Sequence, residues 1–127
     1  MTLLVLILAA LAGLLHVFIF ILESLRWEEP ATRKTFGTTP EQAAMTKQLA
    51  YNQGFYNLFL ALGAFAGIAF AFWPAVSTTL LVVSLGSMVA AAIVLVSNDH
   101  SKVRAALIQG TIPLVALLLL AVRQWTG

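Results

Sequence analysis

Cysteine is absent from this 127-residue chain, and charged residues make up only 9% of it. The lack of cysteine excludes disulfides, thiolate metal sites and cysteine nucleophiles. Soluble domains carry about 25% charged residues, whereas 61% of this sequence is hydrophobic. The low charged fraction and the high hydrophobic fraction therefore indicate an integral membrane protein, with the lipid bilayer as its surroundings and partner. The length suits a single small domain, residues 1–127.

Net charge is low as well. The formal value is +2, and the charged residues gather in polar connections between apolar stretches. A charge this small and this confined gives no indication of nucleic-acid binding. No motif identifies a cofactor.

An almost unbroken apolar run from Leu3 to Leu22 opens the chain. About 20 apolar residues in a helix cross a hydrocarbon core about 30 Å thick. A cleaved signal peptide is the alternative, because Ala10-Leu11-Ala12 resembles a cleavage site. However, no lysine or arginine precedes the run, and the run continues well past that site. We therefore expect a spanning helix.

The hydropathy pattern predicts an all-α integral membrane four-helix bundle, antiparallel, with one long cytoplasmic loop between its first two helices. The expected spans are residues 2–25, 53–73, 76–96 and 103–122, and the polar loop is 26–47. Within the loop, Thr39-Pro40-Glu41-Gln42 has the N-cap, proline and capping-box residues of a helix start. A helix from Pro40 is longer than the membrane needs, so we expect a cytosolic extension or a bend near Gly54. Pro113 should kink the last helix.

Basic residues are distributed unevenly between the two sides of this topology. One side holds Arg26, Arg33, Lys34, Lys47, Lys102 and Arg104, and the other side holds Arg123. Because cytoplasmic loops carry the excess of lysine and arginine, both long connections should be cytoplasmic. Both termini should then face outward from a bacterial plasma (inner) membrane.

Small residues recur four positions apart in several of the apolar stretches. Gly63 and Gly67 form a GxxxG pair, and Gly86 and Ala90 form a looser one. Such pairs let helix backbones approach closely. We interpret them as packing helices within one chain, and they leave the oligomeric state open.

Polar residues interrupt the first span at regular spacing. Glu23 follows His16 by seven residues and Trp27 follows Glu23 by four, which puts Glu23 and Trp27 on the helical face of His16, each within about 20° of it. Ionisable residues inside a span are costly and usually meet a partner, water or a ligand. The alternatives are that Glu23 pairs with Arg26 or a loop lysine, and that a neutral His16 bonds an amide.

Amide and phenol side chains are expected at a similar depth in the other helices. They are Asn52, Gln53, Tyr56, Asn57 and Gln109. Any one of these amides could simply join two helices by a hydrogen bond. Together with Glu23 and Trp27 they predict a polar pocket that opens toward the cytoplasm, is floored by His16 and is covered by the 26–47 connection.

Three elements of the sequence resemble a known family. They are His16 with Glu23 and Trp27, the stretch Tyr51-Asn52-Gln53-Gly54-Phe55-Tyr56-Asn57, and Gln109-Gly110-Thr111-Ile112-Pro113. The chain resembles the small bacterial membrane proteins grouped as domain of unknown function number 1304. The resemblance covers essentially the full chain and implies four spans, but it implies no reaction.

We therefore expect the pocket to bind a small or lipid-like molecule. His16 and Glu23 could extend binding to acid-base catalysis, as emopamil-binding-type isomerases, which are similar in composition only, use such groups. One histidine and one buried glutamate are too few for a metal site. The rival hypotheses are a small proton-coupled transporter, which the charge asymmetry disfavours, and a structural or regulatory subunit whose polar residues would face outward.

Overall fold

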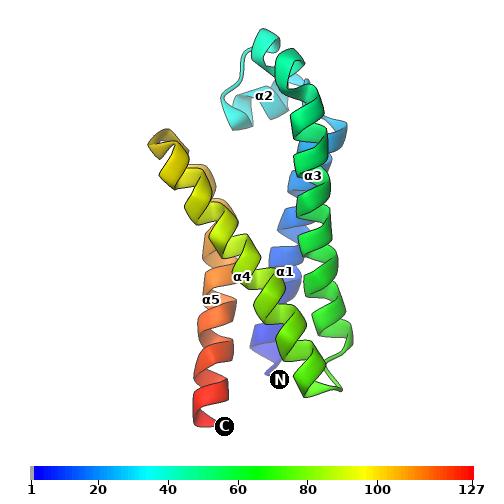
Figure 1. Cartoon of the computed structure of the whole chain (residues 1–127), viewed down its shortest axis with the longest axis vertical. Coiled ribbons are helices and arrows are strands. Elements are labelled where there is room, and N and C mark those ends of the chain that lie inside the picture. Colours follow the sequence, from blue (N-terminus) through cyan, green and yellow to red (C-terminus); the bar gives the residue numbers. More distant parts are fainter. Residues whose placement is uncertain (1) are drawn as a thin grey trace.

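The computed structural model describes residues 2–127 as an all-helical chain, 89% helix and without strands. Figure 1 shows the order of the elements along the chain. The helices are α1 (Leu3–Phe20), which continues into a π-helical turn (Ile21–Leu25), α2 (Pro30–Phe36), α3 (Pro40–Ala69), α4 (Pro74–Asn98), a 3-10 turn (His100–Lys102) and α5 (Val103–Thr126). The predicted fold class, all-α, is confirmed.

Within residues 2–127, three helical segments are long and apolar enough to cross a membrane. They are Leu3–Leu25, Pro74–Asn98 and His100–Thr126. Helix α3 is not among them, although it is the longest helix, because charged and amide side chains such as Lys47, Asn52 and Asn57 lie between its start and its middle. The remaining expected span, residues 53–73, is thus helical through Ala69 but less apolar than the other three.

The connection expected as one long loop is largely helical. Helix α2 begins with Pro30 as its first residue and ends at Gly37, whose φ of 69° is the left-handed conformation that favours glycine. The capping box at Thr39 is confirmed, since Thr39 Oγ1 accepts from Gln42 N and Gln42 Oε1 accepts from Thr39 N. Helix α3 then runs without a break through Gly54.

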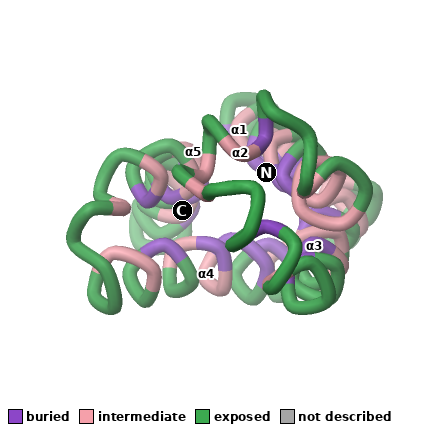
Figure 2. Tube along the Cα trace, turned by 90° about the horizontal axis from the view of Figure 1, so that it is seen from above, coloured by how far each residue is buried: buried purple, intermediate pink, exposed green. Residues whose placement is uncertain are grey.

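Both termini and the α3–α4 turn lie at one end of the molecule, and α2 and the α4–α5 connection lie at the other (Figure 1). Helix α1 packs against α3 and α5, and α4 packs against α3 and α5. Figure 2 shows the buried positions of the long helices turned toward the centre of this arrangement. The polar end is therefore built by α2, the start of α3 and the α4–α5 connection.

Small residues allow α3 to pack closely against its neighbours. A side chain at Gly63 would collide with Ser84 Oγ of α4, and a Cβ at Gly67 would lie 2.7 Å from Leu81 Cδ2. The interpretation of the GxxxG pair as packing within one chain is confirmed. Gly86 differs, because a Cβ there would meet nothing within 4 Å.

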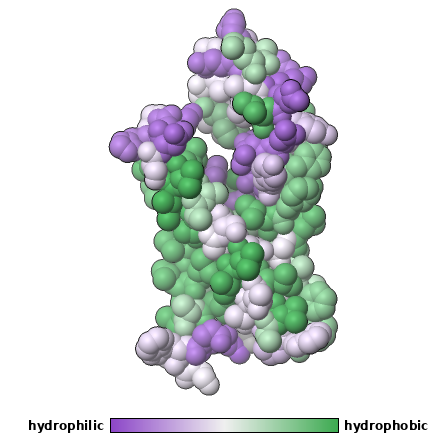
Figure 3. All heavy atoms as spheres, viewed as in Figure 1, coloured by the Kyte–Doolittle hydropathy of each residue, from purple (hydrophilic) through white to green (hydrophobic). Residues whose placement is uncertain are grey.

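Helices α3 and α4 separate toward the polar end. Their close contacts, including the 2.6 Å hydrogen bond from Ser77 Oγ to Gly67 O, lie near the turn that joins them. Further along α4, Ile93 and Val94 are 58% and 66% exposed. Figures 1 and 3 show the two helices diverging there and the surface hollowed between them.

Candidate functional site: a polar groove between two helix pairs

The π-helical turn at the end of α1 brings Glu23 against α3. Its hydrogen bond from Arg26 N to Ile21 O, 3.0 Å, spans five residues instead of four. Ser24 Oγ donates to Tyr51 O at 2.7 Å. The approach is this close because Gly54 has no side chain, and a Cβ there would lie 3.0 Å from Ser24 N. Such π-helical turns occur frequently at functional sites.

Glu23 is half-buried and accepts a hydrogen bond from Asn57. The Nδ2–Oε1 distance is 2.6 Å, and Asn57 Nδ2 also lies 3.3 Å from Gln53 O. Within residues 2–127 the one ion pair joins Lys47 to Glu28 at 3.0 Å. The alternative in which Glu23 pairs with Arg26 or a loop lysine is therefore wrong, and an amide contacts this carboxyl instead.

Trp27 does not continue the helical face of His16 and Glu23. The regular spacing is lost because the π-helical turn changes the register and the helix ends at Leu25. Trp27 instead lies in the turn that follows, where its Nε1 donates to Thr46 Oγ1 at 3.1 Å. Its ring centroid is 5.0 Å from that of Phe36 in α2. The indole is thus held between α2 and α3.

An open groove of about 960 Å³, here called the polar groove, lies at the polar end. Figure 3 shows hydrophilic residues gathered around this hollow. Of the expected site residues, the groove is lined by Glu23, Trp27, Asn52, Gln53 and Tyr56, and the rest of its wall comes from Gly37, Thr38, Gln42, Thr46, Leu49, Ala50, Asp99, Ser101 and Lys102. The structure thus brings together most of the candidates from α1 and α3.

His16 and Gln109 lie apart from these residues. His16 is 1% exposed and its Nδ1 donates to Ala12 O, at 2.9 Å, one turn earlier in its own helix. Because a carbonyl only accepts, the proton is on Nδ1. Gln109 is half-buried on α5. Neither residue lines the polar groove, so the expectation that His16 forms its floor is wrong. The alternative, a hydrogen bond from His16 to an amide side chain, is not found within residues 2–127 either.

The far wall of the groove comes from the α4–α5 connection, which the sequence did not associate with the site. Lys102 Nζ donates to Phe36 O at 2.8 Å, at the C-terminal end of α2. Thr38 Oγ1 is buried and has no hydrogen-bond partner within residues 2–127. The side-chain and backbone hydrogen bonds from Ser101 hold the pKa of Asp99 below its usual value, so this exposed carboxyl is ionised at neutral pH.

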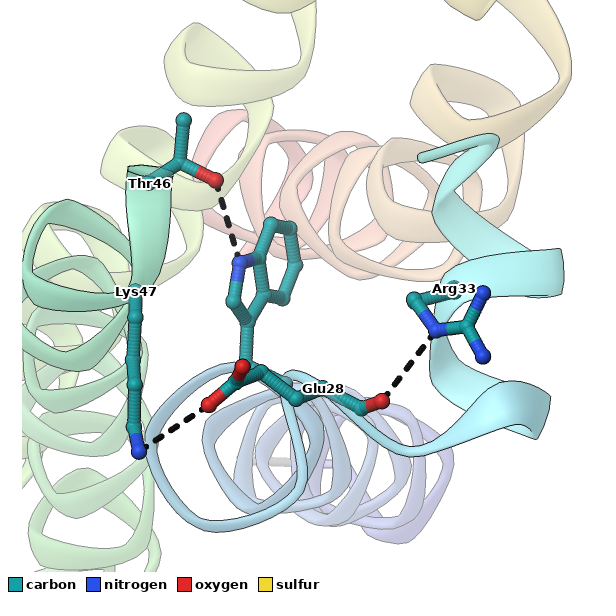
Figure 4. Close-up of polar contacts among 5 residues, drawn as sticks. Glu28, Arg33, Thr46 and Lys47 are labelled. Atoms are coloured by element: carbon teal, nitrogen blue, oxygen red, sulfur yellow. Dashed lines mark hydrogen bonds and ion pairs between the residues drawn. The ribbon is translucent and has the colours of Figure 1, made fainter. Parts of the chain in front are cut away.

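A second groove, of about 820 Å³, lies beside the link between α1 and α2. Figure 4 shows Glu28 between Lys47 of α3 and Arg33 of α2. The Glu28 carboxylate pairs with Lys47, and its carbonyl accepts from Arg33 Nε at 3.2 Å. These contacts fasten the link, and of the expected site residues only Trp27 lines this groove.

The polar groove offers carboxylate, amide, hydroxyl and aromatic groups. Within residues 2–127 no group of three or more histidine, cysteine, aspartate or glutamate side chains could hold a metal ion. The side chains of the polar groove can accept hydrogen bonds and pair with a positive charge. His16, the expected partner of Glu23 in acid-base chemistry, does not line the groove.

These features define an all-helical protein whose apolar helices are compatible with a membrane protein. The model of the family described as protein of unknown function (DUF1304) matches residues 10–121. The chain therefore belongs to this family, as the Asn52 to Asn57 region suggested. Neither the curated proteins nor the solved structures contain a match to the chain.

Proposed function

We propose that this protein is an integral membrane protein of four spans, with α3 as the fourth, and that it binds a small amphiphilic molecule in the polar groove. Two features support four spans. The α3–α4 turn lies at the same end as both termini (Figure 1), as an even number of crossings requires. The second half of α3 also packs closely on α4 through Gly63 and Gly67.

The observation that carries the binding proposal is the state of Glu23. This carboxyl ends an apolar helix, forms part of the groove wall, and has an amide but no cation as its partner within residues 2–127. A carboxyl withdrawn from water without a counter-charge is costly. Its presence at an open groove is consistent with a ligand that provides the missing interaction.

The groove also has the polarity that an amphiphile needs. The amides of Asn52 and Gln53 provide hydrogen bonds for a head group, and Leu49 and Tyr56 provide exposed apolar surface beside them. The catalytic extension has less support, because His16 lies apart from Glu23's groove. Glu23 alone would then serve as the proton-transferring group.

Native mass spectrometry of gently extracted protein tests the proposal. We expect a bound small molecule on wild type that is lost in Glu23→Gln. Glu28→Gln makes the same charge change at an exposed ion pair outside the polar groove, and should retain the molecule. A bound mass that survives Glu23→Gln, or that both variants lose equally, would contradict binding at this groove.

A structural or regulatory subunit is the second candidate, and one observation favours it. Asn52, Gln53 and Tyr56 are exposed on α3, as a surface awaiting another membrane protein would require. A photoreactive phenylalanine analogue in place of Tyr56 distinguishes the candidates in cells. An adduct of small-molecule mass supports ligand binding, and an adduct of polypeptide mass supports a subunit role.

A further inference from the structure

This inference rests on the proposed function and names the chemistry of the ligand. We propose that the polar groove selects amphiphiles with a cationic head, an ammonium or quaternary ammonium group. The head pairs with the Glu23 carboxylate and lies against the rings of Trp27 and Tyr56, which share the groove wall with it.

The charges around the groove favour a cation. Glu23 and Asp99 contribute two carboxyls to its wall, and neither forms an ion pair within residues 2–127. Lys102 is the wall's only lysine or arginine, and its ammonium group already donates to Phe36 O at 2.8 Å. An anionic head would meet two carboxyls against one ammonium group, whereas a cationic head gains the counter-charge that Glu23 lacks.

Aromatic rings make the same distinction independently of the carboxyls. Cations bind over the faces of tryptophan and tyrosine, and quaternary ammonium groups are recognised by such rings. The Trp27 indole is held by its hydrogen bond to Thr46 and its contact with Phe36, so it needs little ordering on binding. Tyr56 is 60% exposed and makes no hydrogen bond through its hydroxyl within residues 2–127, so its ring is accessible.

Amphiphiles of equal chain length and different head charge test this selectivity. The probes are decyltrimethylammonium, decylphosphocholine and decyl sulfate, titrated into protein in micelles of the uncharged detergent dodecyl maltoside, with empty micelles correcting for partition into detergent. Fluorescence is read from Trp27 alone in a Trp73→Phe, Trp125→Phe background, whose substituted residues line neither groove. We expect decyltrimethylammonium to bind at least tenfold more tightly than decyl sulfate.

Variants then assign the selectivity to the groove. Glu23→Gln should weaken decyltrimethylammonium binding at least tenfold, whereas the exposed control Glu28→Gln should leave it unchanged. If Glu23→Gln does not fold, Tyr56→Leu provides the test, because this side chain is exposed. We expect a loss of about threefold or more for Tyr56→Leu and none for Tyr56→Phe.

The outcomes separate the two proposals. Equal or tighter binding of decyl sulfate, lost in Tyr56→Leu, would overturn the cationic head and keep ligand binding at the groove. No saturable binding of any probe would overturn both. Cation binding that is unchanged in Glu23→Gln and in Tyr56→Leu would overturn the assignment to these residues.

Discussion

Asn57 Nδ2 donates to Glu23 Oε1 at 2.6 Å, joining residues 34 positions apart in the sequence. The contact connects the π-helical turn that ends α1 with the middle of α3. Ser24 strengthens the same junction through its hydrogen bond to Tyr51 O. The orientation of the Glu23 carboxyl, on which the proposed binding depends, is therefore set by α3.

Asn57→Ala should destabilise the protein by about 1–2 kcal/mol, because it removes the one hydrogen-bond donor that Glu23 has within residues 2–127. Asn52→Ala is the matched control, since this asparagine is exposed five positions earlier in the same helix, and it should have little effect. Denaturation in detergent, followed by circular dichroism, measures both. Equal loss of stability in the two variants would contradict a special role for the contact.

Gly54→Ala should be costly because its Cβ would collide with Ser24 Oγ and lie 3.0 Å from the backbone nitrogen of Ser24. Overpacking of this kind costs about 1–3 kcal/mol. Gly86→Ala makes the same change where nothing lies within 4 Å, so it should be neutral or stabilise its helix by up to about 1 kcal/mol. The melting temperature of Gly54→Ala should therefore fall below that of wild type. The melting temperature of Gly86→Ala should stay unchanged or rise. A tolerated Gly54→Ala would show that the α1–α3 junction is looser than described.

The sequence predicted those parts of the fold that depend on local chemistry. The start of α3 at Pro40 followed from its capping box, and close packing within one chain followed from Gly63 and Gly67, although the sequence did not name α4 as their partner. Helix α2 carried a readable signal as well, since Pro30 begins it and Gly37 ends it, but the charges around it favoured a loop. Patterns within one helix are thus informative without knowledge of its neighbours.

The site was predicted less completely because it depends on contacts between helices. Spacing placed His16 with Glu23, but it could not reveal the π-helical turn at Ile21–Leu25 or the hydrogen bond from His16 to Ala12 O. No pattern in the sequence around Lys102 associates this residue with α2, because its hydrogen-bond partner Phe36 lies 66 positions earlier in the chain. Grouping Glu23 with the α3 amides succeeded because similar depth in neighbouring helices does bring side chains together.

Lys102→Met should loosen the groove, because Lys102 is the residue whose side chain hydrogen-bonds the α4–α5 connection to α2. Spin labels at Thr35→Cys and Ser97→Cys, both exposed positions, report the separation of the two walls, and the chain has no native cysteine to interfere. We expect a broader distance distribution, measured by electron double resonance, in Lys102→Met. Arg104→Met removes an exposed basic residue nearby and should leave the distribution as in wild type. An unchanged distribution in Lys102→Met would show that other contacts hold the walls.

Single cysteines read the topology and decide whether α3 crosses the membrane. Thr35→Cys, Ala75→Cys, His100→Cys and Thr126→Cys are all at exposed positions near the helix ends. With four spans and both termini outside, an impermeant maleimide should label residues 75 and 126 in intact cells, and residues 35 and 100 only after lysis.

If α3 does not cross while the other three segments do, the labelling pattern changes in a defined way. Residue 100 becomes accessible from outside, and residues 75 and 126 become protected, because every segment after α3 is then inverted. Labelling of residue 75 against residue 100 therefore separates the two topologies, whatever ligand the groove binds.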